Sequence, residues 1–226
     1  MIKFYYHHTP NPRKIALFLE EAGLPYEVVP VDVLKGDQHK SEFRAINPNG
    51  KVPAIVDDGD VVFDSSAILL HLAEKTGKLL GAPKNRPALL SWLMFVASGL
   101  GPFSGQASHF TRIHTESAYA TNRYRRELER HYDVLDARLG QTPFVAGDAY
   151  TIADIAAWGW IDRASSVFGD DGPLDRWPNI KRWFAEVDGR PAVVRARAVG
   201  HDAGLKTAFD EETMRALFPQ NYPAVA

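Results

Sequence analysis

The chain of 226 residues contains no cysteine. This absence excludes disulfides, a protein thiol nucleophile and thiolate metal sites. An excess of one charge is also lacking, because 26 Lys and Arg residues oppose 28 Asp and Glu residues, for a formal net charge of -2. The composition therefore gives no electrostatic footprint for nucleic acid or an anionic membrane. Any sulfur chemistry would have to belong to a ligand.

Long apolar runs are missing as well. No stretch approaches the ~20 apolar residues that span a bilayer, and the polar start MIKFYYHHTP lacks the apolar core of a signal peptide. We therefore expect a cytoplasmic protein with no membrane or nucleic-acid partner. The eight histidines show no helical zinc-site pattern, so we predict no metal. With 45% hydrophobic residues, the chain can bury a sizeable core in one or two domains.

Residues 47–66, NPNGKVPAIVDDGDVVFDSS, specify backbone geometry and polar chemistry together. Asn49-Gly50 is a strong turn dipeptide, and residues 57–59 predict a hairpin between two short apolar strands. Pro53 has no N–H and is tolerated only at the start or edge of a strand. The backbone of Val52 is therefore left free to pair with a ligand such as a peptide.

A helix is predicted directly after this hairpin. Asp64, Ser65 and Ser66 are N-cap residue types, an apolar stripe follows, and Gly77 is a stop signal. The free N–H groups of the helix, with the Ser65 hydroxyl, would bind a carboxylate, and the Asp64 carboxylate would bind an ammonium. An α-amino acid head would satisfy both. The simpler alternative is that Asp64 and Ser65 only cap the helix.

The rest of the first 77 residues reads as alternating strands and helices. Strands are predicted over 2–6 and 26–33, a short helix over 41–45, and a longer helix with Asn11 as N-cap that ends at Gly23. The order is strand, helix, strand, helix, strand, strand, helix. We therefore predict an α/β domain over residues 1–77 with the arrangement of the thioredoxin-like fold.

The composition changes between residues 75 and 87, where Gly, Pro and polar residues predict a domain boundary. An all-helical domain is predicted over 86–200, with helices over 88–99 and 121–139 and further helices starting near 151, 177 and 191. Thr151 and Asp154 form a capping box at the start of one of these helices. The tail, 201–226, has one weak helical segment, Glu211–Leu217.

Thr9 and Asn11 lie where the first strand leads into the first helix. A free thiol has a pKa of about 8.5, and hydrogen-bond donors beside a helix N-terminus favour its charged form. A ligand thiolate would be stabilised there. The alternative is that Asn11 caps the helix and Thr9 serves the turn.

The turn NPNGKVPAIVD and the Asp64-Ser65 pair resemble the glutathione site of the glutathione transferase superfamily. The resemblance implies that Pro53 is cis and that Val52 pairs its backbone with the cysteinyl part of glutathione. It also implies that Asp64 and Ser65 hold the γ-glutamyl head. That family more often has Glu where this chain has Asp64, so the reach to the ammonium is one methylene shorter.

Three further motifs resemble the bacterial Nu class: TPN at the first helix, KGDQ at residues 35–38, and GPFSGQASHF at residues 101–110. The resemblance extends over about residues 1–199. It implies a homodimeric disulfide-bond reductase that uses the thiolate of bound glutathione, with two reduced molecules or one oxidised molecule per site. The residues so implied are Thr9 and Asn11 for catalysis, and Gln38, Lys51, Val52, Pro53, Asp64, Ser65 and Arg123 for binding glutathione.

Some alternatives remain open at this point. Arg123 lies away from the apolar stripe of its predicted helix, so it is either a surface arginine or a ligand contact for its own or a partner subunit. Pro12 stands where the class has Gly, and Asn49-Gly50 replaces Asn-Asn. Two other functions compete with reduction of a small disulfide. One is a conventional transferase or peroxidase acting on electrophiles or hydroperoxides, and the other is a non-catalytic interaction module.

Overall fold

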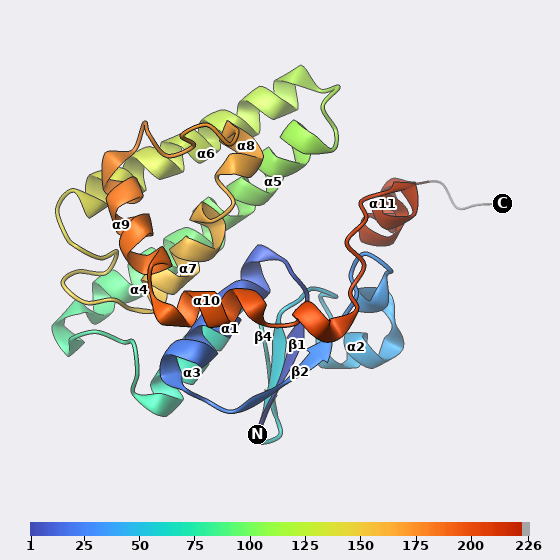
Figure 1. Cartoon of the computed structure of the whole chain (residues 1–226), viewed down its shortest axis with the longest axis horizontal. Helices are drawn as coiled ribbons and strands as arrows, with labels where there is room; N and C mark the ends of the chain where they lie inside the picture. The colour runs from blue at the N-terminus through green and yellow to red at the C-terminus, as the bar shows by residue number, and fades with distance from the viewer. Residues whose placement is uncertain (223–226) are drawn as a thin grey trace.

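The computed structural model describes residues 1–222, and its first half is built on a four-stranded sheet in the order β2-β1-β3-β4 (Figure 1). β1 (Ile2–Tyr6) pairs in parallel with β2 (Tyr26–Pro30) and antiparallel with β3 (Ala54–Asp57). β3 forms the predicted hairpin with β4 (Asp60–Phe63). The predicted order of strands and helices is confirmed.

The second strand is shorter than predicted. It ends at Pro30 instead of Val33, because the chain turns at Asp32, whose carboxylate accepts the backbone N–H of Leu34 at 3.2 Å and of Lys206 at 2.8 Å. Val33 and its neighbours leave the ladder and join a small apolar cluster with Phe43. This turn brings the C-terminal segment close to the sheet.

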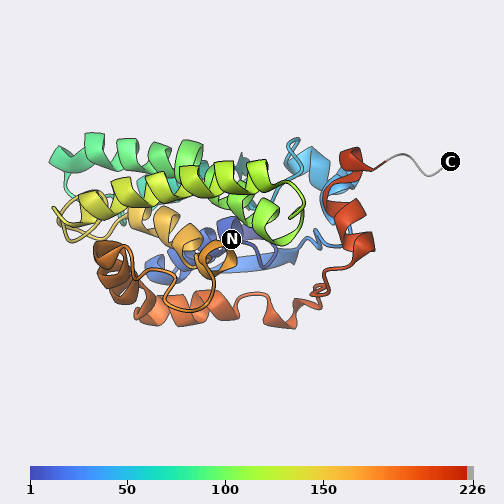
Figure 2. The same ribbon diagram turned by 90° about the horizontal axis from the view of Figure 1, so that it is seen from above.

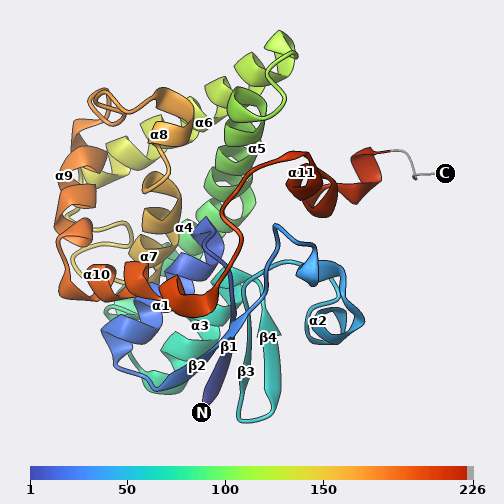
Figure 3. The ribbon, with the colours of Figure 1, turned by 45° about the vertical axis from the view of Figure 1, so that its right-hand side comes forward.

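Two helices pack together beside the sheet, α1 (Pro10–Ala22) and α3 (Ser65–Thr76), and α2 (Ser41–Ile46) lies on the other side (Figure 3). The prediction that Asn11 caps α1 is wrong. Thr9 is the N-cap and Pro10 begins the helix, because a proline lacks only an N–H that the first turn would leave unpaired anyway. Asn11 therefore lies inside the first turn.

The helical half begins with one long rod. The short turn η2 (Pro83–Asn85) leads into α4 (Arg86–Phe95), a π turn η3 (Val96–Leu100) and α5 (Gly101–Arg112). The predicted helix over 88–99 was thus too short. The glycine and proline at its end do not stop it, because Pro102 lies in the first turn of α5, where its missing N–H is tolerated.

The stretch Pro83–Arg112 is long and apolar enough to cross a membrane by length and composition, contrary to the expectation from the sequence. A core helix of a soluble protein passes the same test. Here α5 packs against α6 (Ala118–Leu139), which starts three residues earlier than predicted, and α4 packs against α7 (Ile152–Ile161). We therefore assign the stretch to the helical layer.

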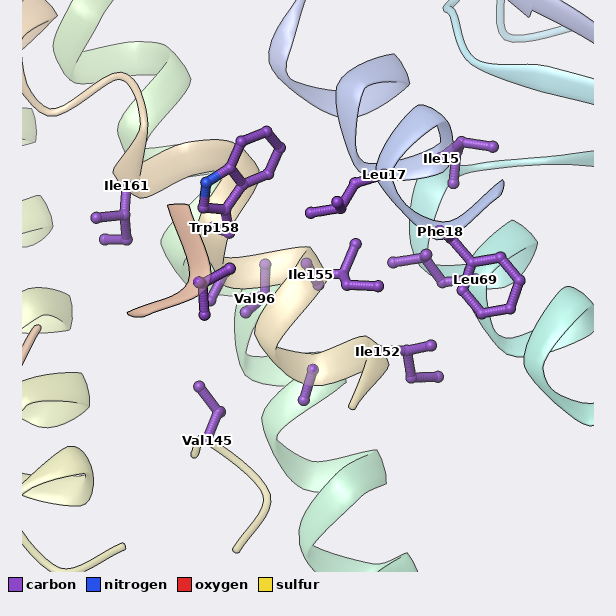
Figure 4. Packing of buried hydrophobic residues seen from close by; sticks show 14 of the residues in the cluster. Ile15, Leu17, Phe18, Leu69, Val96, Val145, Ile152, Ile155, Trp158 and Ile161 are labelled. Carbon is purple, nitrogen blue, oxygen red and sulfur yellow. The ribbon is translucent and has the colours of Figure 1, made fainter. Parts of the chain in front are cut away.

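α7 is almost entirely buried, and apolar side chains from α1, α3 and η3 pack around it (Figure 4). Its capping box is confirmed. The fully buried Asp154 accepts hydrogen bonds from the backbone of Val145 and Thr151 and from Trp183 Nε1. Burial raises the pKa of Asp154 to about 6, and these hydrogen bonds oppose the shift. The helical half is completed by α8 (Ser165–Phe168), α9 (Pro178–Asp188) and α10 (Pro191–Ala198).

After α10 the chain returns to the sheet. It runs through η4 (His201–Ala203) and past the first strands to α11 (Glu211–Leu217), which lies beside the turn over residues 36–39 that precedes α2 (Figures 2 and 3). The predicted helix in the tail is confirmed, and η5 (Pro219–Asn221) follows it. Of the predicted tail, residues 223–226 lie outside the described residues. The tail therefore covers part of the α/β half.

Candidate functional site

Two cavities meet at the start of α1. The first measures about 430 Å³ and the second about 420 Å³. Most of the residues implied by the resemblance line one or both. The first cavity is lined by Thr9, Asn11, Gln38, Lys51 and Val52, and the second by Asn11, Lys51, Asp64 and Ser65. Trp160, at the end of α7, lies between them and lines both. The structure thus brings together side chains from the start of α1, the 47–53 turn and the start of α3.

Thr9 and Asn11 present their side chains at the helix N-terminus. Thr9 is the N-cap of α1, yet its side chain makes no capping hydrogen bond. Asn11 Oδ1 accepts a long hydrogen bond, 3.4 Å, from Ser65 Oγ, which links the start of α1 to the start of α3. Two helix N-termini thus converge on one place, and their partial positive charges favour an anion there.

The turn before β3 is held rigidly. The Val52-Pro53 peptide bond is cis, as predicted. Asn47 fixes the turn from inside, because its Nδ2 donates to Lys51 O at 2.6 Å and its Oδ1 accepts the Asn49 N–H at 3.0 Å. Gly50 has a φ of 63°, and a Cβ there would lie 2.7 Å from the Arg44 guanidinium. The backbone of Val52 is therefore presented to the first cavity in one defined position.

Asp64 caps α3, as the simpler alternative predicted, but the cap uses only half of the carboxylate. Its Oδ1 accepts the backbone N–H of Ser66 at 2.8 Å and of Ala67 at 3.3 Å. The Asp64 side chain is exposed, and within residues 1–222 its Oδ2 accepts no hydrogen bond. The cap and a ligand contact are therefore compatible. Ser65, the first residue of the helix, is buried.

Gln38 is buried and contacts the tail. Its Nε2 donates to the carbonyl oxygen of Ala216 at 3.1 Å, and His39 Nε2 lies 2.9 Å from the same oxygen. The Oε1 atom of Gln38 has no hydrogen-bond partner among the described residues. Leu217 and Phe218 line the first cavity as well. The sequence analysis missed this role of the tail, although an apolar Leu-Phe pair in a polar segment was a possible signal.

Arg123 is placed differently from the other implied residues. It lies on the exposed side of α6 and lines neither of these cavities in the described chain. Two cationic residues that the sequence analysis did not select do line them: Arg44 the first and Lys14 the second. Lys14 had one usable signal, because it follows Asn11 by three residues and so shares its helix face.

A third cavity, of about 260 Å³, adjoins the first at Pro10, Trp160 and Phe218. Its wall is mostly apolar and comes from α5, α6 and α7, with Arg163 at one side. His109 also lines it, and burial lowers the pKa of that imidazole, with a smaller effect from His114. This cavity therefore adds mostly apolar space beside the cavity that Thr9 lines.

Family models match both halves of the chain. The N-terminal domain of glutathione S-transferase matches residues 8–75, and the C-terminal domain of glutathione S-transferase matches residues 118–186. The first match contains the 47–53 turn and the starts of α1 and α3. The first cavity is therefore built mainly from the region of the first match, and the second is shared between that region and the helices α5 and α7.

Individual relatives match over most of their length. The disulfide-bond oxidoreductase YfcG of Escherichia coli is 44% identical over 205 residues, which cover 87% of this chain and 94% of that protein. A glutathione transferase family member from Pseudomonas fluorescens, solved with two glutathione bound, is 39% identical with a TM-score of 0.80, over 87% of this chain and 92% of that one. A glutathione transferase from Pseudomonas putida, with one glutathione disulfide per subunit, is 34% identical with a TM-score of 0.82, over 88% and 91%.

Proposed function

The chain belongs to the glutathione S-transferase family, and from this premise we propose that it is a glutathione-dependent disulfide-bond reductase of the Nu class. One observation carries the proposal. Thr9 is the N-cap of α1, but its side chain makes no capping hydrogen bond and lies beside Asn11 where the cavities meet, in a chain without cysteine. Thiol–disulfide exchange requires a thiolate. Because the protein has none, bound glutathione must supply it.

The proposal places glutathione across the two cavities in the following orientation. Its γ-glutamyl ammonium would bind the free oxygen of Asp64, and its α-carboxylate would lie at Ser65 and the N-terminus of α3. The cysteinyl backbone would pair with Val52, and the glycyl end would extend toward Lys51 and Gln38. The sulfur would then lie at Thr9 and Asn11. Relatives solved with two glutathione or with glutathione disulfide bound support glutathione as the ligand.

The reaction follows from this placement. The glutathione thiolate attacks one sulfur of the substrate disulfide, the disulfide bond breaks, and the released thiolate takes a proton from solvent. A second glutathione thiolate then attacks the mixed disulfide, which releases the second substrate thiol and leaves glutathione disulfide. Thr9 cannot act as a base near neutral pH, so its hydroxyl only donates a hydrogen bond to the charged sulfur. The third cavity would hold the second reactant.

We also propose that the protein is a cytoplasmic homodimer, in which Arg123 serves the site of the partner subunit. Arg123 is exposed on α6, where a second chain can reach it. Size-exclusion chromatography with light scattering should give twice the chain mass of 25.1 kDa. A species of single-chain mass would contradict the dimer and leave Arg123 without this role.

A second candidate function is favoured by the apolar wall of the third cavity, which suits an electrophile or hydroperoxide. The discriminating experiment compares turnover of hydroxyethyl disulfide with turnover of a chloro-aromatic electrophile and of cumene hydroperoxide, at equal glutathione. We expect the disulfide to react fastest by a wide margin. Faster conjugation or peroxide reduction would replace the proposed function with this one.

The third possibility is a non-catalytic interaction module that keeps the fold. Binding of glutathione separates it from both enzymes. A ligand at 100 times its Kd stabilises the folded state by about 2.7 kcal/mol, which a thermal shift assay detects. We expect such a shift with millimolar glutathione, and its absence would favour the interaction module.

A further inference from the structure

Lys14 is a buried cationic residue without a carboxylate partner in the described part of the chain. It lies one turn after Asn11 on α1, and it is only 2% exposed. Its side chain lines the second cavity, together with Asn11, Asp64 and Ser65. No carboxylate of residues 1–222 lies within 4.0 Å of its ammonium. A buried ammonium is costly unless it is paired, so its position calls for an explanation.

The fold makes room for this lysine. α7 approaches α1 at Gly159, where a Cβ would lie 2.6 Å from Lys14 Cγ and 3.0 Å from Lys14 Cε. Only glycine therefore lets the aliphatic part of Lys14 pass between the two helices. The Lys14 ammonium lies 5.3 Å from the ring centre of Trp160, on the side of the second cavity.

The charged groups around the cavity are few. Apart from Lys14 they are Asp64, from the start of α3, and Lys51, from the turn before β3. α5 and α7 contribute only uncharged side chains to it, such as Gln106 and Trp160. Burial lowers the pKa of Lys14 to about 7, and the charge of Asp64 opposes the shift. The free protein therefore holds this group partly uncharged near neutral pH.

We propose that the Lys14 ammonium binds the α-carboxylate of the γ-glutamyl group of glutathione, beside Ser65. This inference rests on the proposed function and adds a residue to it. The cavity then matches an amino acid zwitterion at both ends, because the free oxygen of Asp64 takes the ammonium while Lys14 and the N-terminus of α3 take the carboxylate. The α-carboxylate of the ligand is then the negative charge that pairs with the Lys14 ammonium.

A pH dependence of binding follows. The carboxylate stabilises the charged form of Lys14, so the pKa of Lys14 rises when the ligand binds, and a proton is taken up at pH values above about 7. Affinity should therefore be highest below the free pKa and fall as the pH rises. The probe is S-methylglutathione, which has no thiol that ionises in this range.

The experiment measures the Kd of S-methylglutathione by calorimetry between about pH 6 and 7.5, where the α-ammonium of the ligand stays mostly charged, for the wild type, Lys14→Met and Lys84→Met. Lys84 is an exposed lysine outside the cavities and serves as the matched control. We expect the wild-type and control affinities to fall with pH, by at most tenfold per pH unit. Lys14→Met should bind roughly 10- to 100-fold more weakly at the lowest pH and show a flat profile. It should unfold at the same temperature as the wild type or higher, because a buried charge is removed.

A second ligand keeps the test decisive if Lys14→Met does not fold. The S-methyl analogue built on 4-aminobutyrate keeps the ammonium and lacks the α-carboxylate. Its affinity for the wild type should be weaker and independent of pH, and Lys14→Met should weaken it no further. Equal affinity and an unchanged pH profile in Lys14→Met, or a pH-dependent affinity for the analogue, would overturn the role of Lys14. Failure of the wild type to bind S-methylglutathione at all would instead overturn the proposed function.

Discussion

The N-termini of α3 and α7 share their local chemistry and differ in their surroundings. Each N-terminus has an aspartate that accepts backbone N–H groups: Asp64 is the N-cap of α3, and Asp154 is the third residue of α7, in a capping box with Thr151. At α7 both carboxylate oxygens are used, because Oδ1 accepts Val145 N and Trp183 Nε1 while Oδ2 accepts the backbone N–H and the hydroxyl of Thr151. At α3 only Oδ1 is used, and the carboxylate is exposed at a cavity.

This difference shows how a helix cap becomes a binding group. A carboxylate whose acceptors all have protein donors is structural, because a ligand has nothing left to bind. A carboxylate with one free oxygen at a cavity keeps the helix capped and still offers a charge. The same reasoning applies to Lys14, which is as buried as a core residue and yet has no carboxylate partner among residues 1–222.

The largest effect is expected at α7, where both carboxylate oxygens of Asp154 are used. Asp154→Ala should lower the free energy of unfolding by about 3–5 kcal/mol, because it removes a buried charge and leaves its donors unpaired. Urea denaturation measures this change. The glutathione Kd, measured where the variant is still folded, should stay within about twofold of the wild type, since Asp154 is remote from both cavities. A change of less than about 1 kcal/mol in the free energy of unfolding would show that α7 does not depend on the Asp154 carboxylate of its capping box.

The next effect concerns the thiolate. Thr9→Ala and Asn11→Ala should each lower kcat/KM for disulfide reduction roughly 10- to 150-fold, since a hydrogen bond to a charged group contributes about 1.5–3 kcal/mol. Both should also raise the pH midpoint of thiolate formation, while Thr9→Ser preserves rate and midpoint. Initial rates against pH measure both quantities. If neither alanine variant changes them, the thiolate is stabilised elsewhere, and Tyr6 and His7 are the next residues to replace.

Asp64 allows the two roles of one carboxylate to be separated. Asp64→Asn keeps an oxygen for the cap and removes the charge, so it should retain stability and weaken glutathione binding about tenfold. Asp64→Ala should weaken binding to the same degree and also lower the free energy of unfolding by about 1 kcal/mol through loss of the cap. Calorimetry and urea denaturation measure the two effects. If Asp64→Asn binds as well as the wild type, Asp64 is a cap and nothing more.

The sequence predicted those parts of the fold that short segments specify. The hairpin around residues 57–59, the capping box at Thr151 and the cap at Asp64 each depend on residues within a few positions of one another. Boundaries were harder to predict where two signals competed. Pro10 and Pro12 are both suitable first residues of a helix. The helix begins at Pro10, because Pro12 then lies in the first turn, where its missing N–H breaks no hydrogen bond of the helix.

The site was predictable where a motif places its residues on adjoining elements, as for Asn11 and Ser65, which hydrogen-bond to one another. Two features were not predictable in this way. The burial of Lys14 depends on Gly159, 145 positions along the chain, and the contact of Gln38 with Ala216 spans 178 positions. No local pattern records such contacts, because they arise only when the tail and α7 pack against the α/β half.

The smallest effect tests whether the tail competes with glutathione. Gln38 resembles Asp64 in using only one of its two polar side-chain atoms. Its Nε2 donates to the Ala216 carbonyl, and its Oε1 is buried without a partner among the described residues. For Gln38 Nε2 to reach glutathione, the ligand must displace the Ala216 carbonyl. A chain ending at Gly204 should therefore bind S-methylglutathione about two- to tenfold more tightly, because a neutral hydrogen bond contributes about 0.5–1.5 kcal/mol net. Arg215→Ala, which leaves the Ala216 backbone in place and lines none of the three cavities, is the control and should leave the Kd unchanged. Weaker binding by the shortened chain would show that the tail completes the glutathione site instead of competing for it.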